Sequence, residues 1–301
     1  MKSFFALLLT LVLSVANPFA HAADPFFKPN DIVALVGGED MVAAAEYGHL
    51  ESLLVRALPE YRLKFRSLAW EGDTVFEQPR DLNYPTLEQQ LDEIGATVVI
   101  AQFGQMESLA GEGKLPAFTA AYEKLIDRLG AGGRRRIVLM ASTPVPGAGL
   151  ASKQFKYVAA YTDAIREIAQ RRGLRFILPN DGADIAAASY RDGLHLNEAG
   201  QHAVAVRAAE ALGTGKLADE FMSTDEFRLL DAVRAKNRLW FHYARPQNWA
   251  FLNGDRTVQP SSRDHLDPSK RWFPEEMKQW LPLIETKEQE IWNLAGQIKS
   301  K

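Results

Sequence analysis

The segment DIVALVGGED, residues 31–40, predicts a buried strand that ends in a tight turn into a helix. The apolar run Ile32–Val36 leads to Gly37, and the residues that follow have helical spacing. A strand of this kind places the next side chains at its carboxyl edge, where parallel sheets bind ligands. The side chains presented there are Glu39 and Asp40, with no Ser, Thr or Cys among them. The chemistry of this edge is the question that the sequence raises.

Apolar runs alternate with amphipathic stretches over the first two thirds of the chain. The predicted strands are residues 32–36, 61–68, 97–103, 136–141 and 174–178. The predicted helices are residues 41–58, 116–129, 154–172 and 198–212. Strands and helices that alternate at these lengths imply right-handed crossovers and a parallel sheet between two layers of helices. The sequence therefore predicts an α/β fold with five parallel strands.

Each predicted strand leads into a segment that carries polar side chains. The segments are GGED (37–40), AWEGDT (69–74), FGQMES (103–108), STP (142–144) and, after the fifth strand, DGLH (192–195). Because the carboxyl ends of parallel strands meet at one edge of a sheet, we expect all five segments to converge there.

The first 22 residues have the pattern of a secretory signal peptide. Lys2 is followed by an apolar core over residues 4–15 and by small residues around His21. The apolar core is too short to span a bilayer comfortably, and no later segment approaches spanning length. We therefore expect an exported protein without stable membrane insertion.

The composition excludes several classes of function. The formal charge is −3, and removal of residues 1–22, which carry only Lys2, changes it to −4. A mildly acidic chain with a single short basic run, residues 134–136, does not indicate a nucleic-acid partner. The absence of Cys excludes disulfides, thiol catalysis and cysteine-based metal sites. We expect no cofactor.

Two of the converging segments resemble blocks of the SGNH, or GDSL-type, hydrolases over roughly residues 30–213. In EGDT, Gly72 matches the glycine whose N–H faces the oxyanion in that family, and in DGLH, Asp192 and His195 match its carboxylate and base. A carboxylate three residues before an imidazole can fix the tautomer of the ring. The resemblance implies a three-layer α/β/α, flavodoxin-like fold, and an activity among esterases, lipases and glycan acetylesterases.

The other two blocks depart from the family pattern. Glu39 takes the place of the nucleophilic Ser, and a shift of one residue puts Asp40 there instead. Met106 takes the place of the Asn that donates to the oxyanion, followed by Glu107. A thioether cannot donate, and loss of one such donor typically lowers the rate by ~10²–10³. The stretch from Tyr47 to Val75 resembles a divergent, exported subgroup of the family that often lacks the Ser and carries a C-terminal extension.

Several roles for Glu39 are open at this stage. It can pair with His195 in a protein that only binds its ligand, or it can act as a general base or nucleophile. It can help to hold a cation together with Asp40 and Glu107, or it can cap the helix that follows. We expect Asp40, Glu107 and Asp73 to contact the ligand.

After residue 215 the pattern changes to a helical C-terminal extension that we expect to pack on the main domain. The predicted division is a signal peptide (1–22), an SGNH-like domain (23–215) and this extension (216–301). Ser223 and Glu226 form a capping box, and residues 275–298 predict a closing helix. The segment KNRLWFHYARPQNWAFLNGDR, residues 236–256, mixes aromatic rings with Arg and Asn, a composition suited to binding sugars.

Within that segment two groups are predicted. We expect the first group to pack against the main domain: Trp240, Phe241 and Phe251. We expect the second group to bind the ligand: His242, Tyr243, Arg245, Asn253 and Arg256. Two hypotheses for the whole protein follow. The first is a hydrolase that uses Asp192, His195 and Gly72 with Glu39 on an acylated or carbohydrate-type substrate. The second is an inactive SGNH-fold protein that binds a glycan or serves as a scaffold.

Overall fold

The computed structural model describes residues 26–147, 149–180, 185, 187–217 and 223–299 of the 301-residue chain. The predicted signal peptide, residues 1–22, lies outside the described residues. In the part of the chain that is described, no helix is both long enough and apolar enough to cross a bilayer.

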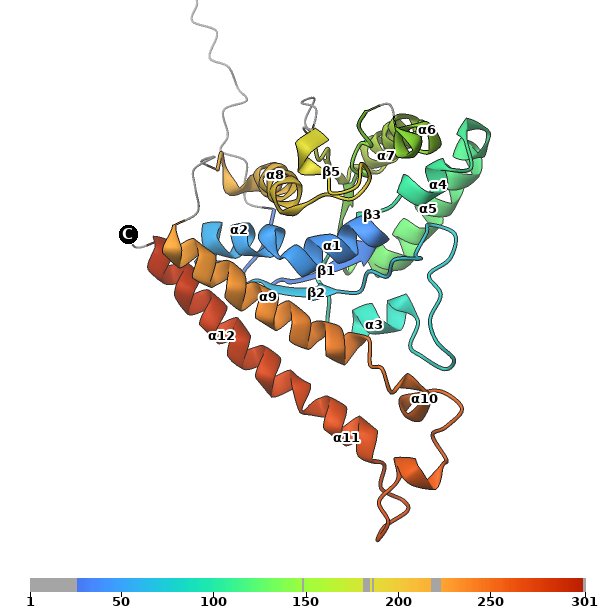
Figure 1. Cartoon of the computed structure of the whole chain (residues 1–301), viewed down its shortest axis with the longest axis vertical. Helices are drawn as coiled ribbons and strands as arrows, with labels where there is room; N and C mark the ends of the chain where they lie inside the picture. The colour runs from blue at the N-terminus through green and yellow to red at the C-terminus, as the bar shows by residue number, and fades with distance from the viewer. Residues whose placement is uncertain (1–25, 148, 181–184, 186, 218–222, 300–301) are drawn as a thin grey trace, which may run out of the picture.

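The protein is built on one parallel sheet of five strands (Figure 1). The strands are β1 (Ile32–Gly37), β2 (Lys64–Ser67), β3 (Val98–Gln102), β4 (Arg136–Met140) and β5 (Arg175–Ile177), and their order is β2-β1-β3-β4-β5. The register pairs Val33 with Phe65 on one side and with Val98 on the other. The prediction of a three-layer α/β/α fold with a five-stranded parallel sheet is confirmed.

Helices cover both faces of the sheet. One face carries α1 (Glu39–Tyr47), α2 (His49–Ala57) and α8 (Glu198–Ala209), and the other carries α3 (Leu87–Glu93), α5 (Leu115–Gly130) and α7 (Val158–Arg172). The shorter elements are η1 (Pro59–Tyr61), α4 (Gln105–Ser108), η2 (Glu112–Lys114), η3 (Ala131–Gly133), α6 (Leu150–Gln154), η4 (Ala187–Ser189), η5 (Glu210–Thr214), α10 (Trp249–Leu252) and η6 (Pro260–Ser262).

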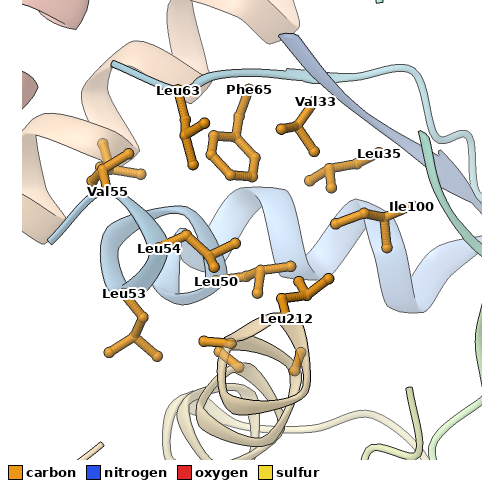
Figure 2. Packing of buried hydrophobic residues seen from close by; sticks show 14 of the residues in the cluster. Val33, Leu35, Leu50, Leu53, Leu54, Val55, Leu63, Phe65, Ile100 and Leu212 are labelled. Carbon is orange, nitrogen blue, oxygen red and sulfur yellow. The ribbon is translucent and has the colours of Figure 1, made fainter. Parts of the chain in front are cut away.

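Alternate residues of each strand fill two separate cores. Val33 and Leu35 of β1 face the α1–α2–α8 layer, whereas Ala34 and Val36 face the opposite layer. Figure 2 shows the first core, in which the side chains of the sheet lie over Leu54 of α2. Because both faces of β1 are buried, its sequence is apolar without a break.

The single helix predicted over residues 41–58 is wrong, since the chain breaks there into α1 and α2. Gly48 lies between them with a left-handed backbone, φ 73°. A Cβ at this position would lie 3.0 Å from Val233 Cγ1 of the C-terminal extension. The glycine therefore allows both the turn and the close approach of a helix from far along the sequence.

The C-terminal extension forms α9 (Thr224–Ala244), α11 (Trp272–Lys278) and α12 (Trp280–Lys299), and Figure 1 shows α9 and α12 side by side. The predicted capping box is present, since Ser223 and Glu226 each accept the backbone N–H of the other. The prediction of one unbroken closing helix over 275–298 is wrong, because the helix restarts at Trp280. The restart places Pro282 in a first turn, where its missing N–H costs no hydrogen bond.

The extension covers the outer edge of β2, the strand that has a neighbour on one side only. Three backbone carbonyls on that edge accept hydrogen bonds from side chains of α9 and α12. The carbonyl of Leu63 accepts from Trp292 Nε1 at 3.1 Å, and that of Ser67 from Trp240 Nε1 at 2.8 Å. Between them, Phe65 accepts from Lys236 Nζ at 3.1 Å. Side-chain donors thus take the place of a further strand.

Lys236 is fully buried and uses all three of its ammonium hydrogens. Besides Phe65, its Nζ donates to Glu51 Oε2 at 2.9 Å and to Asn237 Oδ1 at 2.6 Å. Burial lowers the pKa of Lys236, and the charge of Glu51 opposes that shift. One ammonium group therefore joins α2, β2 and α9.

We predict that Lys236→Met destabilises the protein by about 3–5 kcal/mol, because it leaves the buried carboxyl of Glu51 without its partner. Urea denaturation followed by circular dichroism measures the change. Lys278→Met, at an exposed position on α11, is the control and should change the stability by less than about 0.5 kcal/mol. The double change Lys236→Met, Glu51→Leu should recover most of the loss, and equal stability of Lys236→Met and the control would contradict the prediction.

Candidate active site

The DGLH segment forms a tight turn that fixes its own aspartate. Tyr190 and Leu196 pair as an antiparallel bridge on either side of the turn, and Gly193 takes a left-handed backbone with φ 81°. Asp192 Oδ1 accepts the backbone N–H of Leu194 at 3.0 Å and that of His195 at 2.8 Å. The carboxylate is thereby held in one orientation, with its other oxygen turned to the ring of His195.

His195 lies between two carboxylates. Its Nδ1 is 2.6 Å from Asp192 Oδ2, and its Nε2 is 2.9 Å from Glu39 Oε1. Partial burial lowers the pKa of His195, but the hydrogen bond to Asp192 and the charge of Glu39 outweigh it and raise the pKa above its ordinary value. Hydrogen bonds from the backbone and ring of His195 lower the pKa of Asp192 strongly. The arrangement favours an imidazolium that donates to both carboxylates.

Glu39 is placed by the close packing of β1 on β3. A Cβ at Gly37 would lie 2.3 Å from the carbonyl oxygen of Gln102, so only glycine allows this approach. The chain then enters α1 with Glu39 as its first helical residue. The side chain of Glu39 is 43% exposed, so a ligand can reach its carboxylate beside His195.

Asp40 faces the end of β4. Its Oδ2 accepts from Thr143 Oγ1 at 2.6 Å and from the Thr143 backbone N–H at 3.3 Å. Burial raises the pKa of Asp40, and the two hydrogen bonds from Thr143 oppose that shift. The side chain thus ties the start of α1 to the STP segment.

The carboxyl groups of Glu107 and Asp73 are engaged within the protein. Glu107 Oε1 accepts the N–H of Val75 at 2.7 Å, and its Oε2 accepts the N–H of Gly104 at 2.9 Å. Asp73 forms two hydrogen bonds with Arg80, at 2.8 and 3.1 Å. Burial raises the pKa of both carboxyls. These side chains hold the loops around the site, and ligand contact by either stays a prediction.

A small pocket of about 110 Å³ lies beside Glu39 and His195. Glu39, Asp40 and His195 line it, together with Gln201 of α8 and Arg191. Within the described ranges there is no group of three or more His, Asp or Glu side chains arranged to hold a metal ion. Glu46 and Glu71 line it as well, so the pocket presents one imidazole and four carboxyl groups to a ligand.

The comparison with protein families gives one match. The pattern of the GDSL-like lipase/acylhydrolase family matches residues 32–203, from the start of β1 into α8. The chain belongs to this family. No curated protein matches the sequence.

Three solved structures illustrate the similarities found at low sequence identity. A gut microbial diltiazem-metabolizing enzyme has a TM-score of 0.56 at 11% identity, with 90% of this chain and 95% of that chain covered. A catalytic mutant of an acetylxylan esterase from Geobacillus stearothermophilus has a TM-score of 0.46 at 15% identity, with 64% and 97% covered. An active-site mutant of a family two carbohydrate esterase from Clostridium thermocellum has a TM-score of 0.44 at 14% identity, with 63% of this chain and 65% of that chain covered. The similarity to the diltiazem-metabolizing enzyme covers 90% of this chain. Residues 1–215 make up a smaller share than that, so the similarity extends into the C-terminal helices.

The segments predicted to face the oxyanion are those that carry Gly72 and Met106. Gly72 is exposed, and the carbonyl oxygens of its neighbours Asp73 and Glu71 would lie 3.3 and 3.7 Å from a Cβ at Gly38. Gly38 thus allows the loop of residues 71–73 to lie close to the start of α1. The atoms of the loop nearest to Gly38 are backbone carbonyl oxygens, which accept hydrogen bonds. Met106 is 48% exposed, and its thioether has no hydrogen to donate. The roles predicted for Asp192, His195, Glu39 and Gly72 stay predictions, although three of the four lie together.

The five residues predicted as ligand contacts in the extension separate into two groups. His242 and Arg245 line a groove beside the pocket, whereas Tyr243 packs on Trp240 with a ring distance of 5.3 Å. Among the described residues, Asn253 and Arg256 line neither the groove nor the pocket.

The structure adds residues to the site that sequence patterns did not indicate. Gln201 and Arg191 line the pocket, and Arg80 neutralises Asp73. Gln201 lies three residues after the start of α8, and no motif marks it. The hydroxyl of Thr143 was visible at the end of the fourth strand, but only the fold shows that it bonds to Asp40.

We predict that Glu39→Gln and Asp192→Asn each lower the pKa of His195, because each removes a negative charge within 3 Å of the ring. The titration of the His195 ring proton signals by NMR measures the shift. Glu167→Gln, on the exposed side of α7, is the control and should leave the pKa unchanged. An unchanged pKa in Glu39→Gln would show that the Glu39–His195 contact does not form in solution.

Proposed function

We propose that this GDSL-family protein hydrolyses an ester bond of an acylated, carbohydrate-type substrate with Glu39 and His195 in place of a serine nucleophile. The observation that carries the proposal is the contact between Glu39 and His195 Nε2 in the lining of a pocket. Asp192 occupies the other ring nitrogen, so Nε2 is the one that faces the reacting groups. A protein that only binds its ligand needs no such arrangement.

Glu39 serves as the general base and His195 as the general acid. As a water oxygen bonds to the ester carbonyl carbon, Glu39 takes a proton from that water. A tetrahedral oxyanion forms, and protonated His195 gives its Nε2 proton to the leaving alkoxide as the carbon–oxygen bond breaks. The carboxylic acid and the alcohol leave. The proton on Glu39 then passes to His195 Nε2, and the starting state returns.

Asp192 holds the imidazolium in place and stabilises its charge through the 2.6 Å contact. The oxyanion receives less support than in family members that carry the Asn, because Met106 has no donor to offer. One missing donor corresponds to a rate loss of ~10²–10³. We therefore expect slow turnover.

The second candidate function is glycan binding without catalysis. It is favoured by the oxyanion side, where the carbonyls of Glu71 and Asp73 lie near Gly38 and Met106 replaces a donor. The retained Asp192–His195 turn weighs against it. We also propose that the protein is exported, and the support for this is the signal pattern in residues 1–22.

We predict that the mature chain releases acetate from acetylated oligosaccharides, and that His195→Ala and Glu39→Gln each lower the rate by ~10²–10⁴. Each change removes one of the two proton carriers. Acetate is measured by a coupled assay. Glu167→Gln on α7 is the matched carboxylate control and should keep the wild-type rate.

The double change Glu39→Ser, Met106→Asn distinguishes the two candidate functions. Acetate release only by this double variant, and none by the wild type, would contradict the carboxylate mechanism. That result would mean that a hydrolase fold has been retained for binding. A wild-type rate that survives Glu39→Gln would contradict the role of Glu39.

The proposed mechanism also fixes the direction of the pH dependence. Since His195 acts as an acid, kcat/KM falls as the pH rises through its pKa, which lies above the ordinary 6.5. In Asp192→Asn the charge that raises this pKa is lost, so the alkaline limb of the profile moves to lower pH. The pH profiles of wild type and variant measure the shift. An activity that increases across the same range would assign His195 the role of a base.

A further inference from the structure

A larger groove of about 770 Å³ lies between α1 and α9, next to the catalytic pocket. Its floor includes the end of β2, and one wall is formed by the C-terminal half of α9. Val42, Glu46, Tyr47 and Glu71 line both the groove and the small pocket. The two hollows therefore adjoin along these four residues, and Glu39 and His195 lie on the side of the small pocket.

The sizes of the two hollows assign different parts of a substrate to them. The pocket, at about 110 Å³, holds the volume of roughly four water molecules. It fits a short acyl group. The groove, at about 770 Å³, lies within the range of ~300–1,000 Å³ typical of ligand sites. The alcohol part of the ester, which is the larger part, belongs in the groove.

The ionic side chains of the groove are balanced in number. Three carboxylates, Glu46, Glu71 and Glu198, face three guanidinium groups, Arg234, Arg238 and Arg245. Two of these arginines are already paired, Arg234 with Glu198 and Arg245 with Glu71 at 2.8 Å. A groove without net charge gives no advantage to an anionic or a cationic ligand. It offers both donors and acceptors of hydrogen bonds, which suits hydroxyl groups.

An exposed aromatic ring lies among these polar groups. Phe241 lines the groove and is 46% exposed, although the sequence predicted that it would be buried in packing. The guanidinium of Arg245 lies 5.2 Å from the ring centre of Phe241 and also bonds to the carbonyl of Ala69. The ring is therefore held beside ordered donors, and a flat apolar face with such donors is suited to the face of a sugar ring.

We propose that the groove between α1 and α9 is a binding site for a neutral oligosaccharide, which the protein holds by Phe241 and the three arginines that line the groove. Binding in the groove does not require catalysis. The inference rests on the proposed function only where it assumes that the bound oligosaccharide carries the ester bond that is cleaved. The extension thus supplies the residues that select the substrate, and the GDSL-like domain supplies the residues that react with it.

Calorimetric titration with unacylated oligosaccharides tests the site without turnover. The neutral probes are xylohexaose, cellohexaose and mannohexaose, and the charged probes are the hexamers of galacturonic acid and of glucosamine. We expect at least one neutral hexamer to bind and both charged hexamers to bind more weakly. Phe241→Ala should weaken binding of the neutral hexamer about tenfold, because it removes the exposed ring.

Phe227→Ala is the matched control, since Phe227 is an exposed phenylalanine at the other end of α9, outside the groove. It should leave the affinity unchanged. Arg238→Ala, in which the groove loses a guanidinium that has no described partner, should weaken binding without a change in fold. Failure of all three neutral hexamers to bind, or tighter binding of a charged one, would overturn the inference.

A second measurement on the wild type separates this inference from the proposed function. Hydrolysis of p-nitrophenyl acetate without oligosaccharide binding would leave the ester chemistry intact and remove the groove as a glycan site. Oligosaccharide binding that Phe241→Ala weakens, without any ester hydrolysis, would support the groove and contradict the proposed catalysis.

Discussion

The ammonium group of Lys236 is the interaction on which the arrangement of the molecule depends. It is buried without access to water and gives its three hydrogens to Glu51, Asn237 and the carbonyl of Phe65. These acceptors belong to α2, α9 and β2, so one charge connects the main domain, the sheet edge and the extension. Removal of one partner of a buried ion pair leaves an uncompensated charge, and here the pair holds α9 against α2 and β2. The wall of the groove and the ring of Phe241 belong to the same helix.

Much of the fold follows from local patterns in the sequence. The five strands and most of the helices around them were predictable because apolar periodicity and glycine stops are local signals. The break at Gly48 was not, since its reason is a contact with Val233, far along the chain. The break before Trp280 follows from Pro282, which is local, but the apolar face of residues 275–298 obscured it. Phe241 and Trp240 are adjacent in sequence, yet one is exposed and the other buried, because only the position of β2 decides which face of α9 is covered.

In the candidate site, too, some features follow from local sequence and others depend on contacts between distant segments. DGLH could be recognised because its aspartate, glycine and histidine form a turn that is complete within seven residues of chain. The contact of Glu39 with that turn depends on the tight packing of Gly37 on Gln102 and on the position of α1. Sequence alone left Glu39 with several roles for this reason. The engagement of Glu107 by backbone N–H groups and of Asp73 by Arg80 likewise depends on loops that meet only in the folded protein.

The covered edge of β2 has a consequence for the order in which the protein can mature. The strand is made early, but its three outward carbonyls find their partners at Lys236, Trp240 and Trp292, which follow it by 171 to 229 residues. Contacts at such separation can form only after the long intervening segment has been made. During synthesis the strand therefore stays an open edge that can pair with another copy. The outer edge of β2 is covered only after α9 and α12 have both been made, so residues far along the sequence keep this early strand from pairing with another copy.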